Sequence, residues 1–225
     1  PLIHGGGEIN LSNIVERLSN EEIDVSVLTS KFKGLPEYEE VRGVKIYRKI
    51  QTGKSPSGLY SNFIRSLVFP MSVSRKVKKL NNIRDFDIIH FIGNSIITSK
   101  TIRKLGIPMF ATIESYPTLC PKGDRFYMGK EECKFVCSPL KFFKCQLSSE
   151  EIGKMKNRWY LKYNPLFLSY IYLHYYRLRE SLKYCNLISI SEYVKGIVNL
   201  HNYNSIVIPN VIEFSEFGTL HKVER

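Results

Sequence analysis

Residues 87–113 read DIIHFIGNSIITSKTIRKLGIPMFATI, and their pattern indicates the fold class. Asp87–Ile92 is an apolar run of the length of a buried strand. Ser95–Leu105 follows with a helical pattern that Gly106 ends, and Ile107–Ile113 reads as the next strand. Short apolar runs that alternate with helical patterns are typical of βαβ units. The stretch therefore predicts an α/β fold with a parallel sheet.

The same alternation continues on both sides of this stretch. It predicts helices at 9–18, 60–80, 150–184 (interrupted near Asn164-Pro165) and 191–200, and strands at 24–29, 44–50, 186–190 and 205–208. Charged residues interrupt strand 44–50, so we expect it near a sheet edge. Residues 114–146 show no clear periodicity. A doubly wound sheet begins with a strand before its first glycine-rich turn, and we expect that strand to precede residue 1.

Composition limits the function classes. The 225 residues suit one large domain or a domain with a sizeable insertion. Hydrophobic residues make up 43% and charged residues 24%, which excludes a disordered or collagen-like chain. A net charge of +12 favours an anionic partner, namely nucleic acid, an anionic membrane or a phosphorylated small molecule. The basic residues are scattered, so a solvated basic surface explains them equally well.

A glycine-rich segment precedes the first predicted helix and consists of Gly5, Gly6, Gly7 and Glu8. Glycines let a ligand approach the backbone closely, and the free N–H groups of a helix N-terminus attract anions. The segment is therefore a candidate phosphate or sugar-phosphate cradle, although a flexible turn has the same composition. The dinucleotide pattern G-x-G-x-x-G is not present.

Two predicted strands end in polar residues. His90 lies in the strand at 87–92 and Asn94 follows it, and Glu114 follows the strand at 107–113. Ligands of open α/β sheets bind outside the carboxyl ends of the strands. His90 and Asn94 are thus candidate ligand-binding residues, with a core histidine as the alternative for His90. Glu114 is a candidate general base, or else a helix cap or surface acid.

Four of the five cysteines lie in the aperiodic segment, namely Cys120, Cys133, Cys137 and Cys145. Four clustered cysteines can hold a structural zinc ion or an iron–sulfur cluster. They can instead form two disulfides in an oxidising compartment, or remain free thiols. No C-x-x-C pair selects among these alternatives.

Basic and aromatic residues crowd the region that follows. The aromatic residues are Trp159, Tyr160, Tyr163, Phe167, Tyr170, Tyr172, Tyr175 and Tyr176. This combination suits a membrane interface, and a core-facing helix with a solvated basic side is the alternative. No apolar run reaches the roughly 18 residues that a membrane span needs.

Taken together, these motifs resemble the N-terminal half of the GT-B glycosyltransferases of family 4. The matching segments are 5–8, 24–29, 87–90, 107–113, 190–195 and 207–213. Within the last of them, Asn210 and Glu213 stand in a run similar to the family's v-I-P-N-G-V-D. The run from Thr112 to Cys120-Pro121 is similar to that of members with a cysteine-bearing insertion.

The resemblance implies a Rossmann-like domain that spans residues 1–225 without its first strand and carries an insertion at about 114–184. It implies the acceptor-binding half of a retaining, hexosyltransferase-like enzyme of polysaccharide biosynthesis. A UDP- or GDP-sugar would be the donor, and a glycan or lipid-linked molecule the acceptor. Gly6 and Gly7 would lie by the donor phosphates or the acceptor. No metal is expected at the catalytic centre and no nucleic acid as partner. The donor-binding domain is expected to be absent, so these residues alone should be inactive.

Glu114 stands where the family often has a functional histidine, and Val211 replaces the usual glycine of the last run. The expected location is the cytoplasm, with peripheral contact to the inner face of an anionic membrane. The alternative is a non-enzymatic, basic, metal-stabilised binding module for nucleic acid or another anionic partner.

Overall fold

A computed structural model describes residues 6–51, 64–148 and 163–210 of the chain. The chain divides into two compact units. Unit 1 comprises residues 1–48 and 209–225, and unit 2 comprises residues 49–208. In the described ranges, no helix combines the length and the apolar character that a membrane crossing requires.

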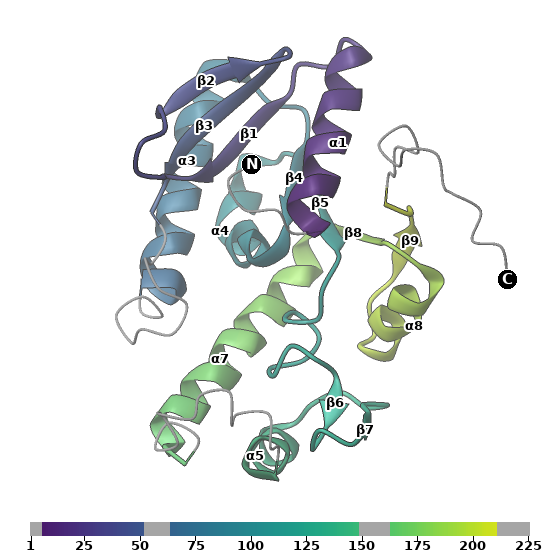
Figure 1. The fold of residues 1–225 in the computed structure, drawn as a ribbon. Helices are drawn as coiled ribbons and strands as arrows, with labels where there is room; N and C mark the ends of the chain where they lie inside the picture. Colours follow the sequence, from purple (N-terminus) through teal and green to yellow (C-terminus); the bar gives the residue numbers. More distant parts are fainter. Residues whose placement is uncertain (1–5, 52–63, 149–162, 211–225) are drawn as a thin grey trace, which may run out of the picture. The chain divides into compact units, whose positions relative to one another are not determined.

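In its described residues, unit 1 has one helix and a three-stranded sheet (Figure 1). Its elements are α1 (Gly6–Asn20), β1 (Ser26–Ser30), β2 (Tyr38–Val41) and β3 (Val44–Ile50), and the strand order is β1-β3-β2. The prediction that strand 44–50 lies near an edge is wrong, because β3 is the middle strand. Its charged residues are tolerated there because they are paired: Lys45 contacts Asp24 at 2.6 Å, and Arg48 contacts Glu39.

The turn between β2 and β3 fastens the hairpin to α1. Arg42 and Gly43 both have positive φ, at 50° and 77°, as a two-residue turn between antiparallel strands requires. Ser19, near the end of α1, donates a hydrogen bond to the Arg42 carbonyl at 3.0 Å, and the Arg42 guanidinium pairs with Glu16. Helix and hairpin are thereby joined within unit 1.

Unit 2 contains the predicted parallel sheet. Its strands are β4 (Ile89–Ile92), β5 (Met109–Ile113), β8 (Asn186–Ser189) and β9 (Ser205–Val207), in the order β4-β5-β8-β9. Each neighbouring pair is parallel. The α/β class and the parallel sheet predicted from the sequence are therefore confirmed.

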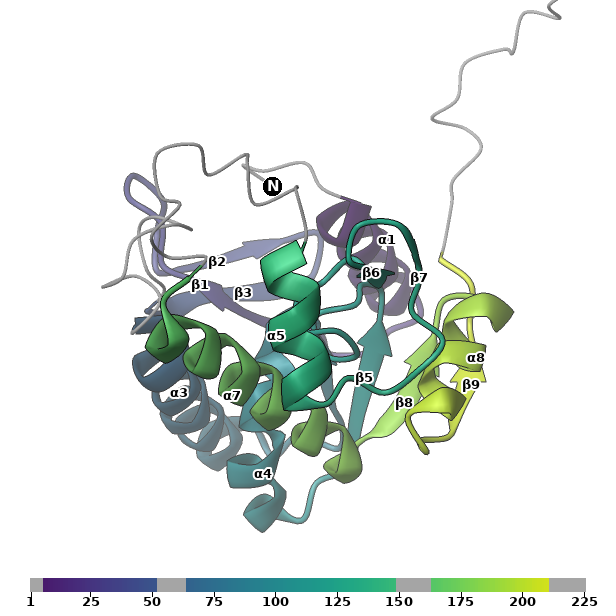
Figure 2. The ribbon, with the colours of Figure 1, turned by 90° about the horizontal axis from the view of Figure 1, so that it is seen from below.

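Helices complete unit 2 (Figure 2). Among them are α3 (Phe69–Arg84), α4 (Ser99–Ile102), α7 (Pro165–Ser181) and α8 (Glu192–Leu200). A π-helical turn at Ile64–Val68 precedes α3, and 3₁₀ turns at Gly93–Thr98 and Arg103–Leu105 flank α4. A further 3₁₀ turn at Leu182–Tyr184 follows α7. Both α3 and α7 contact the turn at 93–98. The buried Ser99 hydroxyl donates to the Ser181 carbonyl at 2.8 Å and joins α4 to the end of α7.

Two helices begin at boundaries that the sequence indicates, α8 at its predicted start and α7 at the predicted interruption of a longer helix. Asn164 caps α7 by accepting from the N–H groups of Leu166 and Phe167, and Pro165 occupies the first helical position. The predicted interruption of a helix at 150–184 is thus the start of α7, while residues 149–162 lie outside the described residues. Ser191 caps α8 in the same way, through the N–H of Val194.

The segment after β5 is more ordered than its sequence pattern suggests. It contains β6 (Phe126–Tyr127), β7 (Glu131–Glu132) and α5 (Pro139–Ser148). The sequence shows no clear periodicity over 114–146, and it therefore did not indicate α5. This helix packs on α7 through Phe142 and Tyr172, whose ring centroids are 5.8 Å apart, so that the segment belongs to the core of unit 2.

Candidate functional site

The carboxyl edge of the parallel sheet in unit 2 carries the predicted ligand-binding residues of strands β4 and β5. Ile92 lies opposite Thr112, and Ile113 opposite Ser189. Because neighbouring strands are parallel and in register, the residues that follow them leave the sheet at one edge. This is the edge at which open α/β sheets bind their ligands.

Asn94 lies at this edge, two residues after the end of β4. Gly93 has a φ of 61° and turns the chain from the strand into the 3₁₀ turn. The Ser95 hydroxyl donates to the carbonyl of Ile92 at 2.9 Å and holds this turn. Asn94 itself is exposed, so its amide is available to a ligand with hydroxyl or phosphate groups.

Glu114 leaves the same edge directly after β5 and is half-buried. The chain then makes a tight turn in which the Tyr116 carbonyl accepts the N–H groups of Leu119 and Cys120, at 2.8 Å and 2.7 Å. A half-buried carboxylate at the end of a central strand can accept a proton or a hydrogen bond from a sugar hydroxyl.

His90 lies within β4. Its Nε2 is 2.7 Å from the hydroxyl of Thr112 on β5. His90 is opposite Phe110 in the register, so Thr112 is its diagonal neighbour on the same face of the sheet. The residue as a whole is exposed, yet burial of part of its ring lowers the pKa of His90. Thr112 is not among the predicted site residues, because its position beside His90 depends on the register of β4 and β5.

Three of the remaining predicted residues belong to unit 1 and start α1. The helix begins at Gly6, so Gly6 and Gly7 form its first turn rather than a preceding loop, and Glu8 is the acidic residue of that turn. A carboxylate there is favourable because the backbone N–H groups carry partial positive charge. Gly5 and Glu213 lie outside the described residues. Asn210 is described and exposed.

All four clustered cysteines line one small cavity in unit 2. The lining residues are Leu119, Cys120, Pro121, Lys122, Arg125, Tyr127, Cys133, Phe135, Cys137, Phe142 and Cys145. The space open to the centre of a water-sized sphere is about 10 Å³, roughly what a single water molecule needs. The five cysteines are free thiols. Across the described ranges, no three His, Cys, Asp or Glu side chains stand in a metal-binding arrangement.

The thiols of this cavity interact with one another. Burial first, and the neighbouring cysteines second, raise the pKa of Cys133 to about 11 and that of Cys137 to about 12. Cys145 accepts the N–H of Met128 at 3.1 Å, and Cys137 lies 3.7 Å from the carbonyl of Ser138. The fifth cysteine, Cys185, lies outside the cavity lining, just before β8.

One buried polar residue escaped the sequence analysis. His201 is 1% exposed, and neither ring nitrogen has a hydrogen-bond partner in the part of the chain that the structure describes. Burial, then the positive charges of Arg179 and Arg125, lower the pKa of His201 to about 4. Its spacing from Val194, Ile197 and Val198 places it on the buried stripe of α8, and this periodicity was the signal available in the sequence.

The chain is similar to known glycosyltransferases in its fold and in its sequence family. The fold is similar to the crystal structure of a UGT transferase from Siraitia grosvenorii in complex with UDP, with a TM-score of 0.50 and 10% sequence identity. The match covers 92% of this chain and 44% of that chain, so these residues span less than half of that protein. No curated protein matches the sequence. The family model of Glycosyltransferase Family 4 matches residues 4–216, and the chain belongs to this family.

Proposed function

We propose that these residues form the acceptor-binding half of a retaining glycosyltransferase. The enzyme would move a sugar from a UDP- or GDP-sugar to a glycan or lipid-linked acceptor of polysaccharide biosynthesis. The observation that carries the proposal is the family match over residues 4–216. The position of Asn94 and Glu114 at the carboxyl edge of the sheet supports it.

The chemistry requires that the acceptor hydroxyl lose a proton as it attacks the sugar. The new glycosidic bond forms at the anomeric carbon, the bond to the nucleotide phosphate breaks, and the nucleoside diphosphate leaves with the electron pair. Glu114 is our candidate for the group that accepts the hydroxyl proton. Asn94 would bind and orient the acceptor through its amide, which both donates and accepts hydrogen bonds.

The donor proposal rests on a neighbour and on the start of α1. The structural neighbour was solved with UDP. Gly6 and Gly7 begin α1, and backbone N–H groups at a helix start attract phosphate oxygens. We further propose that the 225 residues bind an acceptor but do not transfer sugar alone, and that a separate donor-binding domain is required.

The test is glycosyl transfer by the natural gene product that contains these residues. Nucleotide release would be measured with UDP- and GDP-sugars, each with glycan and lipid-linked acceptors. We expect Glu114→Gln to lower the rate at least about 100-fold, which is the lower end of general-base contributions. Glu131→Gln, at an exposed position of β7 in the same unit, is the matched control and should retain the rate.

Two results would contradict the proposal at different levels. If Glu114→Gln retains the wild-type rate, Glu114 is not the base, while the transferase proposal stands. If no nucleotide-sugar releases nucleotide with any acceptor, the transferase proposal itself fails.

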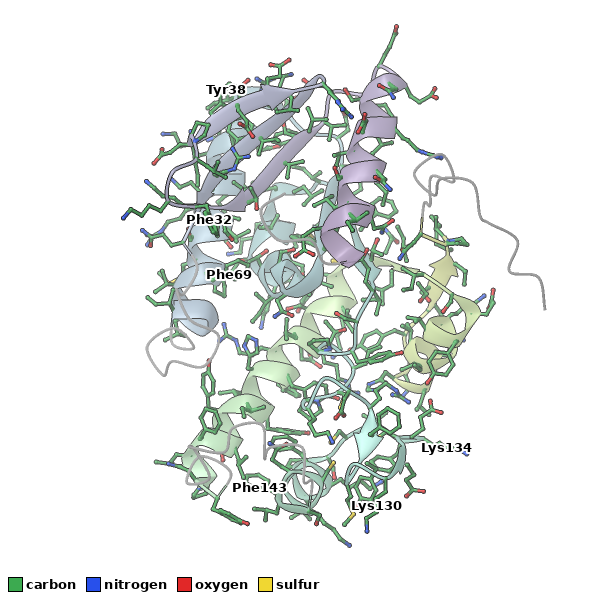
Figure 3. The ribbon with its side chains drawn as sticks, viewed as in Figure 1. Phe32, Tyr38, Phe69, Lys130, Lys134 and Phe143 are labelled. Carbon is green, nitrogen blue, oxygen red and sulfur yellow. The ribbon has the colours of Figure 1, made fainter. Side chains whose placement is uncertain are left out.

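We also propose that unit 2 makes peripheral contact with the anionic cytoplasmic face of a membrane. Apolar side chains project from α5 and from the N-terminal end of α7, where Leu140 is 83% exposed and Leu166 is 81% exposed. The exposed Lys141 and Lys144 are on α5 as well. Figure 3 shows Lys130, Lys134 and Phe143 at the same end of unit 2. Lysines beside exposed apolar side chains suit an anionic bilayer surface.

A further inference from the structure

Cys120, Cys133 and Cys137 lie between β5 and α5, and Cys145 lies on α5, yet all four line the same cavity. Between β5 and α5 this segment has only β6 and β7, which have two residues each. A two-stranded hairpin is marginally stable by itself, so side-chain packing, a cross-link or a metal ion must hold this part of the segment.

The size of the cavity limits the ion or cluster that it can hold. Its free interior, about 10 Å³, accommodates a single atom or water-sized particle. An iron–sulfur cluster contains at least four inorganic atoms and needs far more room. Leu119 and Phe142 are 1% exposed and help to close the walls, so the interior is shielded from water.

Polar groups at the cavity offset part of the burial that disfavours thiolates. Cys145 receives a hydrogen bond from the backbone N–H of Met128, at 3.1 Å. An N–H that points at sulfur favours the thiolate, because it stabilises the negative charge. Lys122 and Arg125 belong to the same lining and supply positive charge. Arg125 is 3% exposed and donates to the carbonyl of Cys133, which connects the cation to one of the four cysteine positions.

We propose that Cys120, Cys133, Cys137 and Cys145 bind one structural Zn²⁺ ion in this cavity. Four thiolates are a common ligand set of closed structural zinc sites. The four thiols would lose their protons to solvent as four Zn–S bonds form, and no oxidation or reduction takes place. The sulfurs do not stand in ligating positions in the described structure, so the ion would draw them inward across the small interior.

The first experiment measures metal in the full 225-residue chain purified without chelators. We expect about one zinc per chain by elemental analysis, and replacement by Co²⁺ should give the absorption of a tetrahedral thiolate site. Cys133→Ser and Cys137→Ser should each weaken Zn²⁺ binding at least about tenfold, since even changes next to ligands cost 10–100-fold. Cys185→Ser is the matched control, because this cysteine is outside the cavity lining, and it should bind zinc as the wild type does.

The proposal is overturned by any of three outcomes. The chain could hold no zinc and give no thiolate absorption with Co²⁺, it could hold iron with sulfide, or intact-mass measurement could show two disulfides. Circular dichroism of each variant separates a lost ligand from a lost fold. If a serine variant fails to fold, the wild-type chain still tests the zinc proposal. A chelator that removes the zinc should lower its melting temperature, and added Zn²⁺ should restore it. A melting temperature that does not respond to removal of the zinc contradicts a structural role.

Discussion

His201 is a buried histidine that the fold keeps uncharged. The pKa of its ring is lowered to about 4, whereas a histidine in an unfolded chain titrates near 6.5. Between these values the unfolded state binds more protons than the folded state. The free energy of unfolding therefore falls as the pH drops through this window, and the whole contribution is present above pH 6.5.

We predict that His201 makes the wild-type chain lose about 3 kcal/mol of stability between pH 6.5 and 4, from 1.36 kcal/mol per pKa unit. The variant His201→Leu should lack this part of the pH dependence, since leucine does not titrate. Urea unfolding at several pH values measures the difference. Parallel pH profiles of the two proteins would show that His201 is not the group responsible.

Gly43 is a second residue with a clear physical requirement. Its φ is 77°, and a Cβ atom there would lie 2.5 Å from the Ser19 hydroxyl oxygen. That hydroxyl would have to rotate away and lose its hydrogen bond to Arg42. Gly34 has a φ of 88° with open space around it, so it shares the backbone strain without the clash.

We predict that Gly43→Ala destabilises unit 1 by about 1–3 kcal/mol, through strain at positive φ and loss of the Ser19 hydrogen bond. Gly34→Ala should cost less, because only the strain applies. Hydrogen exchange in the peptides of α1 and β3 reports the stability of this unit. If the two variants lose the same free energy of unfolding, the close approach of residue 43 to Ser19 does not contribute.

At the scale of elements, the cap of α7 is decided by two adjacent residues. Asn164 accepts N–H bonds from Leu166 and Phe167 at 3.0 Å and 3.1 Å, and Pro165 has the fixed φ that a helix start requires. These features are local, which is why the sequence predicts the boundary. The middle position of β3 is not local, because it depends on a partner strand, β2, that the apolar pattern did not predict.

We predict that Asn164→Ala lowers the free energy of unfolding by about 1 kcal/mol, the usual cost of a lost N-cap. Asn164→Asp keeps an oxygen acceptor at this position and should retain most of the stability. Chemical denaturation of the three proteins provides the measurement. A loss as large in the aspartate variant as in the alanine variant would argue against capping as the cause.

At the scale of the whole molecule, the net charge of +12 and the exposed leucines of α5 and α7 bear on membrane contact. We predict that the chain co-sediments with anionic liposomes at low salt and less at high salt, because salt screens the attraction. The double variant Leu140→Glu with Leu166→Glu should reduce binding without changing stability. Ile83→Glu, at a 69% exposed position of α3, should bind as the wild type does. No sedimentation at low salt would refute the membrane proposal.

Periodicity and caps act over a few residues, so the sequence predicts the α/β class, the parallel sheet of unit 2 and the boundaries at Gly106, Asn164 and Ser191. It also placed Asn94 and Glu114 after strands. The folded structure was needed to show that β3 is a middle strand, that His201 is buried without a hydrogen-bond partner, and that the four clustered cysteines share one cavity. Each of these depends on contacts between elements, and the periodicity within one element does not encode such contacts.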